Sequence, residues 1–223
     1  MKRKIIKTAD GSTTIHLVDW DEQYHSKHGA IQEAYHVFIK SGFERFTPKA
    51  NEPLNILEIG FGTGLNAFIT FLEAQKLALK VDYVGIEAYP VENEELEHLN
   101  YIQELSAEKF KDIFDKMHQV SWEESHAITN DFNLFKRKQF FSEINDIATY
   151  DLIYFDAFGA RVQPELWTEA IFAKMFNALK SNGLLVTYAA KGSVRRAMQA
   201  VGFTVERLPG PPGKREMLRA VKG

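Results

Sequence analysis

The order of apolar and polar stretches along the chain predicts alternating strands and helices. Short runs rich in Val, Ile, Leu, Phe and Tyr are typical of buried strands, and they cover 54–59, 81–87, 128–135, 151–155, 183–189, 203–207 and 216–221. The longer segments between them predict helices over 64–78, 91–117, 164–180 and 193–201. This alternation predicts an α/β fold with a Rossmann-like, doubly wound, mostly parallel sheet of seven strands. Because no helix separates the last two strands, we expect them to form a terminal antiparallel pair.

The N-terminal residues follow a different pattern. Two short runs on either side of Asp10-Gly11 predict a β-hairpin over 5–18. A helix is expected to follow over 30–41. We therefore expect a small N-terminal extension, whose hairpin and helix cover the site, and a main domain; these are 1–45 and 46–223.

A glycine-rich turn after the first core strand carries the strongest chemical signal in the sequence. Gly60, Gly62 and Gly64 lie at alternate positions before an apolar helical segment. Glycine adopts positive φ and has no Cβ, so the backbone can turn sharply and approach a ligand closely. The helix that begins there directs free N–H groups and the positive end of its dipole to the same place. This arrangement predicts a cradle for a nucleotide-type cofactor.

The spacing of the glycines narrows the choice of cofactor. A dinucleotide fingerprint needs glycine at the position of Leu65, and the chain contains no phosphate-loop motif. The next strand ends at Glu87, an acid suited to the hydroxyl groups of a ribose. This pattern resembles the class I S-adenosylmethionine (SAM) methyltransferases. A NAD or FAD site and a purely structural glycine turn are the alternatives.

Further candidates follow the later strands, since ligands of such folds bind at the carboxyl ends of the strands. Asp156 ends the strand at 151–155. Burying an unpaired carboxylate is costly, so we predict a catalytic or cofactor-binding role for it, with helix capping as the alternative. Phe158 either stacks on a planar ligand or packs within its loop. Lys191, after the following strand, is a candidate phosphate or substrate contact.

Composition excludes several classes of protein. The chain has no cysteine, which rules out disulfides, zinc–thiolate centres and cysteine nucleophiles, and we predict no metal site. No apolar run approaches the roughly 18 residues of a membrane span. No signal-peptide core follows the basic N-terminus. We therefore expect a cytoplasmic protein without membrane contact.

The charge distribution is uneven. The formal net charge is −3, yet the segment 191–223 contains eight Lys and Arg against two Glu. Such a cluster is either a solvated surface or a contact surface for the phosphates of a nucleic acid. The candidate nucleic-acid contacts in it are Lys191, Arg195, Arg196, Lys214 and Arg215.

A set of short motifs lies in order along almost the whole chain, at 21–26, 29–34, 37–38, 60–66, 156–158, 163–167, 190–196, 200–203 and 214–218. Together they resemble the methyltransferase domain of the tRNA 5-methylaminomethyl-2-thiouridine biosynthesis bifunctional protein family. The resemblance implies SAM-dependent methylation of the primary amine of 5-aminomethyl-2-thiouridine at the wobble position, in the anticodon stem-loop of a tRNA. Because no second glycine fingerprint follows, we expect the stand-alone methyltransferase form. A separate FAD-dependent oxidase, or upstream tRNA-modifying enzymes, are the partners this implies.

The resemblance also implies roles for individual residues. Asp156 is expected to be catalytic, and the basic residues named above are expected to contact tRNA. Tyr24, Glu33 and Tyr35 are expected to close over the sulfonium. The implied cofactor-binding residues are Glu58, Gly60, Phe61, Gly62, Thr63, Gly64, Asn66, Glu87, Ala88, Asp156, Phe158, Tyr24 and Glu33.

The sequence departs from the family pattern in two places. Gly159-Ala160 replaces an Ala-Pro pair in the loop after Asp156. Related enzymes carry an acid after the third strand that holds the adenine amino group, whereas this chain has Lys136-Arg137-Lys138 there. The resemblance therefore assigns no adenine contact.

Three other functions are compatible with parts of the pattern. A polyamine aminopropyltransferase-like enzyme shares the sheet and is suggested by Tyr24-His25-Ser26, although its substrates need several acids where this chain has a basic cluster. A non-catalytic RNA-binding module of the SAM fold is disfavoured by the intact glycine turn with Glu87 and Asp156. A nicotinamide oxidoreductase is disfavoured by Leu65.

In the favoured interpretation, Asp156 orients the amine, accepts its hydrogen bond or passes its proton to water.

Overall fold

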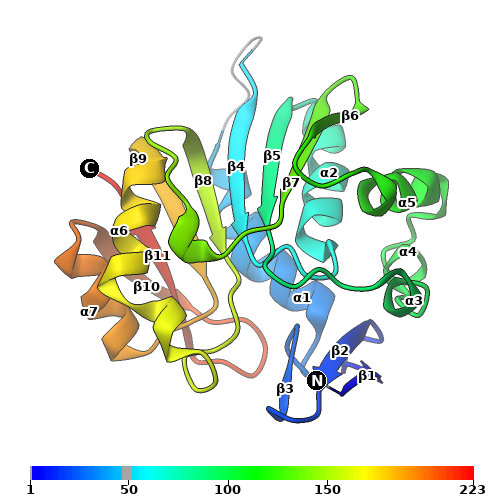
Figure 1. Cartoon of the computed structure of the whole chain (residues 1–223), viewed down its shortest axis with the longest axis horizontal. Helices are drawn as coiled ribbons and strands as arrows, with labels where there is room; N and C mark the ends of the chain where they lie inside the picture. The colour runs from blue at the N-terminus through cyan, green and yellow to red at the C-terminus, as the bar shows by residue number, and fades with distance from the viewer. Residues whose placement is uncertain (1, 47–51) are drawn as a thin grey trace.

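The structure, a computed structural model, describes residues 2–46 and 52–223 as a large sheet covered by helices on both faces, with a small sheet beside it (Figure 1). The large sheet has eight strands in the order β10-β11-β9-β8-β4-β5-β7-β6. They are β4 (Leu54–Ile59), β5 (Val81–Ile86), β6 (Ser125–Thr129), β7 (Phe132–Arg137), β8 (Tyr150–Phe155), β9 (Leu179–Thr187), β10 (Thr204–Pro209) and β11 (Glu216–Val221). The predicted α/β class is confirmed.

The centre of the sheet is parallel and its edges are antiparallel. Strands β9, β8, β4, β5 and β7 run parallel, and β10 and β11 form the predicted antiparallel pair. The predicted number of strands is too small by one, because the segment 128–135 belongs to a hairpin of β6 and β7 that turns at Asn130-Asp131. Asn and Asp suit the backbone conformations of tight hairpin turns, so this polar pair separates two strands.

Side chains alternate across the large sheet and form two hydrophobic layers. In β4, Ile56 joins the layer that contains helix α2 (Leu65–Leu77). Leu57 and Ile59 join the opposite layer, which contains α6 (Glu169–Ala178) and α7 (Gly192–Ala200). A strand buried on both faces reads as a continuous apolar run, and this explains why these strands are predictable from the sequence.

Two predicted helical segments differ from the structure. The segment 164–180 begins as a 3₁₀ turn, η5 (Pro164–Trp167), continues as α6 and becomes β9 at the fully buried Leu179. Burial in the sheet therefore overrides the helical pattern at its end. The segment 91–117 is divided into α3 (Asn93–Leu96), α4 (Tyr101–Glu104), η3 (Glu108–Phe110) and α5 (Lys111–Gln119). Another 3₁₀ turn, η4 (Phe141–Glu143), lies between β7 and β8.

The N-terminal segment forms a small antiparallel sheet beside the carboxyl ends of the parallel strands (Figure 1). The predicted hairpin is present, and a short third strand lies where the sequence indicates no regular element. The expected helix is an α-helical turn continued by a π-helical one, and it packs in the same hydrophobic layer as α2. These elements are β1 (Arg3–Lys7), β2 (Thr13–Leu17), β3 (Glu22–Gln23), α1 (Ala30–Ala34), η1 (Tyr35–Lys40) and η2 (Phe43–Arg45).

The described part of the chain contains neither a membrane-spanning helix nor a cluster of metal ligands. No helix within residues 2–46 and 52–223 combines the length and apolar character needed to cross a bilayer. Over the same residues, no group of three or more His, Asp or Glu side chains is placed to hold a metal ion.

Candidate active site

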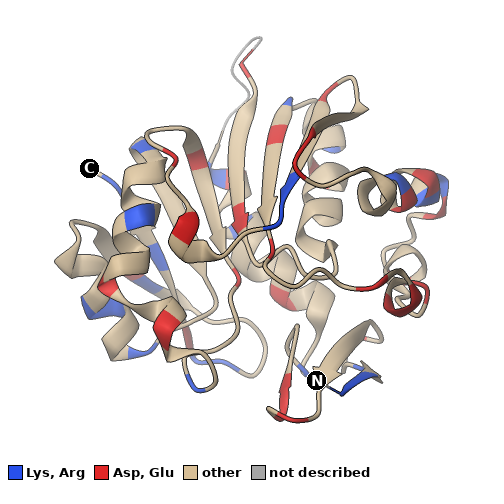
Figure 2. Cartoon of the chain, viewed as in Figure 1, with Lys and Arg blue, Asp and Glu red and all other residues tan. Residues whose placement is uncertain are grey.

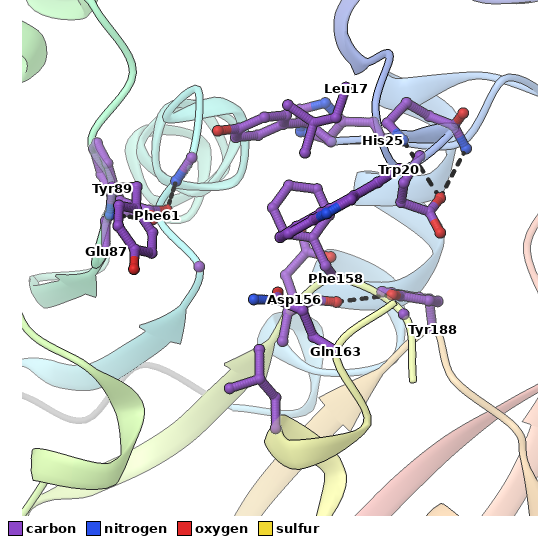
Figure 3. Close-up of a pocket in the computed structure, with 18 of the residues that line it drawn as sticks. Leu17, Trp20, His25, Phe61, Glu87, Tyr89, Asp156, Phe158, Gln163 and Tyr188 are labelled. Carbon is purple, nitrogen blue, oxygen red and sulfur yellow. Dashed lines mark hydrogen bonds between the residues drawn. The ribbon is translucent and has the colours of Figure 1, made fainter. Parts of the chain in front are cut away.

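A cleft of about 1370 Å³ opens at the carboxyl ends of β4, β5 and β8. Its floor comes from the loops that follow these strands, and its roof comes from the N-terminal segment around Tyr24 and Glu33. Figure 3 shows Asp156 and Phe158 near the centre, Glu87 and Tyr89 on one side and Tyr188 on the other. The cleft therefore lies where ligands bind in open α/β sheets.

The glycine turn after β4 forms one wall of the cleft. Gly60, Gly62 and Gly64 have φ of 90°, 50° and 71°, values that favour glycine. A Cβ on Gly60 would lie 2.7 Å from the carbonyl oxygen of Asp156, and one on Gly62 would lie 3.1 Å from the Tyr24 ring. Glycine is therefore needed here for the close approach of β4 to β8 and of the roof to the turn.

Glu87 joins the end of β5 to this turn. Its Oε2 accepts a hydrogen bond from the backbone N–H of Gly62 at 3.1 Å, and its Oε1 accepts one from the N–H of Tyr89 at 3.0 Å. Burial raises the pKa of the Glu87 carboxyl, and the hydrogen bonds from backbone N–H groups oppose this shift. Glu87 lines the cleft together with Ala88 and Tyr89, so a carboxylate faces the cavity directly beside the glycine turn.

Asp156 follows β8 and is held by an amide from helix α2. The side-chain nitrogen of Asn66 lies 2.9 Å from Oδ2 of Asp156 and 2.9 Å from Oε1 of Glu58. Burial and the nearby Glu33 raise the pKa of Asp156, Asn66 and Lys214 lower it, and together they bring it to about 7. A pKa near neutrality in a cleft is typical of groups that take part in proton transfer, so Asp156 is a candidate for this role.

A second charged group lies on the roof side of Asp156. Glu33 accepts hydrogen bonds from the backbone N–H of Ser26, at 3.2 Å, and from the ammonium of Lys214. That ammonium also lies 3.8 Å from the centre of the Tyr188 ring, within the range of a cation–π contact. The Tyr188 hydroxyl donates to the carbonyl oxygen of Ala157 at 2.8 Å. Two carboxylates and one ammonium thus converge next to an aromatic ring.

Aromatic rings enclose the space above Asp156. Phe158 meets Tyr24 edge to face with ring centres 5.0 Å apart, and it meets Trp20 in the same way at 6.0 Å. All three rings line the cleft (Figure 3 labels Trp20 and Phe158). The faces and edges of such rings attract cations and planar groups.

Comparison with known proteins shows the family. A family model described as "S-adenosyl-L-methionine-dependent methyltransferase" matches residues 97–223, more than half of the chain. The chain belongs to this methyltransferase family. It is an enzyme whose cofactor is SAM, and the expected SAM cradle is thus favoured over the NAD, FAD and non-catalytic alternatives.

Curated relatives carry the name expected from the motifs. The chain is 29% identical over 211 residues to the tRNA 5-methylaminomethyl-2-thiouridine biosynthesis bifunctional protein of Leptospira borgpetersenii serovar Hardjo-bovis (strain JB197), covering 89% of this chain and 32% of the relative. It is 27% identical to the protein of the same name from Cupriavidus metallidurans, covering 89% and 31%. The predicted resemblance is confirmed, and the methyltransferase spans about a third of the length of these relatives.

Solved structures confirm the fold. MNMC2 from Aquifex aeolicus superposes with a TM-score of 0.79 at 24% identity, covering 98% of this chain and 69% of that one. Spermidine synthase from Thermotoga maritima gives a TM-score of 0.58 at 15% identity, covering 99% and 69%. Because a spermidine synthase shares this architecture, the fold alone does not identify the group that is transferred.

Most residues predicted to bind the cofactor line the cleft of the methyltransferase, and three do not. Thr63 is buried and shares a hydrogen bond with Tyr101, and Gly64 is the N-cap residue of helix α2. Glu58 is fully buried beneath the cleft, and burial raises its pKa well above the usual range. It supports Asn66 without reaching the cavity. The predicted cofactor-binding residues that do line the cleft are Gly60, Phe61, Gly62, Asn66, Glu87, Ala88, Asp156, Phe158, Tyr24 and Glu33.

One prediction about a single residue needs correction. Tyr35 does not line the cleft; its hydroxyl donates to Glu73 on α2 at 2.9 Å. A side chain on a helix points to one face only, and on this helix Glu33 faces the cleft and Tyr35 faces α2. Lys214 lines the cleft and pairs with Glu33, and its contact with tRNA phosphates stays a prediction.

Two of the three basic residues after the third predicted strand are structural. Lys136 is 1% exposed and donates to the carbonyl oxygen of His118 at 2.8 Å. Arg137 forms an ion pair with Asp146 at 2.9 Å. The residues that follow, Phe140 to Ser142, line the cleft near Tyr89, and the rings of Tyr89 and Phe140 lie 6.0 Å apart. This side of the cleft therefore offers aromatic and backbone groups in place of an acid from this loop.

Several residues of the cleft are not predicted by the sequence. Trp20 lies in a segment without a regular pattern, and Tyr89 lies two positions after the predicted Glu87. Tyr188 lies at the end of a predicted strand, three positions before the predicted Lys191. The sequence pattern places Gln163 at a helix start, and the structure places it both before η5 and in the cleft. Extending the candidate set to every residue within three positions of a strand end would include Tyr89 and Tyr188.

The residues of the cleft fit SAM. The surface without a Cβ at Gly60 and Gly62 lets the methionine part of the cofactor approach the backbone closely, and the Glu87 carboxylate beside it suits ribose hydroxyls. The flat aromatic surfaces near Tyr89 suit a purine ring. A cavity of about 1370 Å³ exceeds the usual size of a site for one small molecule, so it leaves space for an acceptor.

The charged neighbours of Asp156 should shift the pH dependence of methyl transfer in opposite directions. Lys214 lowers and Glu33 raises the pKa of Asp156. If the ionised carboxylate is the active form, Lys214→Met should move the acidic limb of the kcat/KM profile to higher pH, and Glu33→Gln should move it to lower pH. Profiles of both variants beside Lys80→Met test this, because Lys80 is exposed and precedes β5, at the opposite end of that strand from the cleft. Shifts in the same direction would contradict it.

Proposed function

We propose that this methyltransferase transfers the methyl group of SAM to the primary amine of 5-aminomethyl-2-thiouridine at the wobble position of tRNA. The observation that carries the proposal is the pair Asp156 and Glu33, two carboxyl groups that face one cleft, with the pKa of Asp156 raised to about 7. A carboxylate pair of this kind recognises an alkylammonium and takes up its proton. The names of the curated relatives support the choice of nucleoside.

The residues of the cleft supply binding and orientation. Bound SAM supplies a methyl group on a positively charged sulfur. Gly60 to Gly62 and Glu87 would hold its amino-acid and ribose parts, leaving Asp156 free to face the acceptor. Tyr24 and Phe158 would exclude water and stabilise positive charge between them. Placing two reactants in line can supply most of the acceleration of such a displacement.

The acceptor must lose a proton before it can attack. An alkylammonium has a pKa near 10 in water, so at neutral pH the aminomethyl group arrives charged. Glu33 and Asp156 attract this cation, and Asp156 accepts one proton from it, since its own pKa of about 7 leaves much of it ionised at neutral pH. The neutral nitrogen is then hydrogen-bonded to the protonated carboxyl. Proton transfer to water restores Asp156 for the next cycle.

A direct experiment tests the proposal. The protein is incubated with labelled SAM and with tRNA from cells that lack the modification, and the digested nucleosides are separated. Label in 5-methylaminomethyl-2-thiouridine is expected. Label at another nucleoside would overturn the choice of substrate. Aminopropyl transfer from decarboxylated SAM to putrescine, with no methyl transfer to tRNA, would favour the alternative function, a polyamine aminopropyltransferase, whose fold is similar.

The proposed substrate requires other enzymes that act on the tRNA beforehand. A free aminomethyl group arises only after an earlier modification of the wobble uridine, so a separate FAD-dependent oxidase or another upstream tRNA-modifying enzyme would supply this substrate. A wobble base lies in a single-stranded loop and can be turned outward into a recessed cleft. No membrane partner is proposed.

The basic residues of the C-terminal part are the proposed contacts for tRNA phosphates. Lys191, Arg196 and Arg215 are exposed, and Arg195 is partly buried. Figure 2 shows Lys and Arg on and around α7, whereas α3 at the opposite side of the molecule is acidic. The tRNA would therefore approach the cleft from the side of α7.

The double variant Lys191→Ala/Arg196→Ala should weaken binding to all tRNAs to a similar extent. Each lost phosphate contact should also lower the slope of log K against log salt by roughly 0.7 to 0.9. Titrations of labelled tRNA at several salt concentrations measure both quantities. If affinity and slope match the wild-type protein, the cluster is a solvated surface and the tRNA docks elsewhere.

A further inference from the structure

A second groove adjoins the cleft on the side of α7. Its volume is about 480 Å³, within the size range of sites for small organic molecules. The two cavities share Gly159, Tyr188 and Lys214 as lining residues. A chain that places one unit in the cleft beside Asp156 can therefore place the next unit in the groove.

The groove has an apolar floor and a basic rim. Ala189, Ala190 and Val194 form much of the floor, together with the rings of Trp167 and Tyr188. Such a surface packs well against a flat ring and offers little to a free anion.

The rim carries the charges. Arg161, Lys191 and Arg215 line the groove, and the single carboxylate among its lining residues, Glu216, lies 3.7 Å from Arg207. Lys191 and Arg215 are exposed, so the rim is positive where solvent reaches it. An apolar floor beneath a cationic rim matches a nucleotide, which joins a flat base to a phosphate.

Arg161 connects this groove to the roof of the cleft. Its guanidinium donates to the carbonyl oxygens of Trp20, at 3.3 Å, and Asp21, at 2.9 Å, and lies 3.3 Å from the carboxylate of Glu22. The loop after Asp156 is thereby tied to the segment that carries the aromatic roof. A ligand that orders this loop also orders the roof, so occupation of the groove should favour turnover as well as binding.

We propose that this groove binds the nucleotide that directly adjoins the target nucleoside in the RNA chain. Its base packs on the floor around Ala190, and its phosphate lies at Lys191 and Arg215. This inference rests on the proposed function, because it takes the occupant of the cleft to be part of an RNA. It deepens that function, since it predicts recognition of a dinucleotide unit in addition to the general attraction of a tRNA backbone.

The test compares short acceptors that differ by one nucleotide. The protein receives 5-aminomethyl-2-thiouridine as the nucleoside, as dinucleotides extended by uridine on the 5′ or the 3′ side, and within tRNA. The wild-type protein should use one of the dinucleotides at least about tenfold better than the nucleoside in kcat/KM, a gain typical of one stacked base. In Ala190→Phe, which fills the partly exposed floor, and in Lys191→Ala/Arg215→Ala, this dinucleotide-to-nucleoside ratio should fall to about one.

Matched variants control for size and charge. Ala200→Phe adds the same ring at the exposed end of α7, and Arg45→Ala/Lys80→Ala removes two exposed charges from residues that do not line the groove; both should keep the wild-type ratio. An equal ratio for the groove variants and the wild-type protein, with tRNA still methylated, overturns the groove and leaves the proposed function intact. If the wild-type protein methylates neither dinucleotide better than the nucleoside, the groove assignment is likewise overturned and the proposed function is unaffected. Failure to methylate both tRNA and nucleoside overturns the proposed function, and the groove assignment with it.

Discussion

Replacement of Asp156 by asparagine is expected to lower kcat for methyl transfer by about a thousandfold, within the range that one general base contributes. Asparagine keeps an oxygen for the Asn66 amide, which lies 2.9 Å from the carboxylate in the structure, and it cannot accept a proton. The substrate amine would then remain an ammonium with no lone pair for attack. Single-turnover measurements with saturating SAM and tRNA give this rate directly.

The stability of the same variant separates a catalytic role from a structural one. Burial raises the pKa of Asp156 from 3.8 to about 7, so ionisation of the native protein costs free energy. The stability that its protonated form contributes is complete below about pH 4 and is lost as the pH rises through about 7. Because the asparagine side chain does not ionise, Asp156→Asn should melt at the same temperature as the wild-type protein, or higher, at pH 8. Rapid turnover by this stable variant would make Asp156 a structural residue only.

Gly60→Ala is expected to weaken SAM binding by up to about a hundredfold. Gly60 has φ of 90°, and a Cβ there would lie 2.7 Å from the carbonyl oxygen of Asp156. A side chain in such a conformation costs up to about 3 kcal/mol, and the turn would relax away from the shape that cradles the cofactor. Since about 1.4 kcal/mol is a tenfold change in affinity, the loss reaches two orders of magnitude. Calorimetry with SAM and with S-adenosylhomocysteine measures it.

A second glycine provides the control for this change. Gly192 is the first residue of α7 and has ordinary φ, and a Cβ there would meet only the flexible end of Arg196 at 3.2 Å. Gly192→Ala should therefore keep the affinity for SAM. If Gly60→Ala also binds SAM normally, the turn is not the cradle of the cofactor.

The sheet was predictable from the sequence because its central strands are buried on both faces. Strands such as β4 and β8 appear as mostly apolar runs, and the glycine turn marks where β4 ends. The hairpin of β6 and β7 was not predictable in the same way. Its exposed positions carry polar residues such as Ser125 and Asn133, which interrupt the apolar pattern. The sequence therefore predicted a single strand over 128–135 in place of two.

The site was predictable where its residues belong to the strand ends. Glu87 and Asp156 follow strands, and the parallel sheet brings their positions to one edge. The partners of Asp156 were not predictable. Lys214 lies 58 positions after Asp156 in the sequence, and only the hairpin of β10 and β11 carries it back to Glu33. A charge count along the chain groups it with the exposed basic residues instead.

Local patterns in the chain were enough to predict the α/β class, the glycine turn and the two acids at the strand ends, because these depend on periodicity and on the conformational freedom of glycine. The packing of whole elements selected which side chains of the N-terminal helix face the cleft, and it buried Glu58 beneath Asn66. It also joined Lys214, Tyr188 and Glu33 into one charged wall. These contacts link residues far apart in the chain. Their pairing, and with it the pKa of Asp156, arises only when the elements pack together and leaves no local pattern in the sequence.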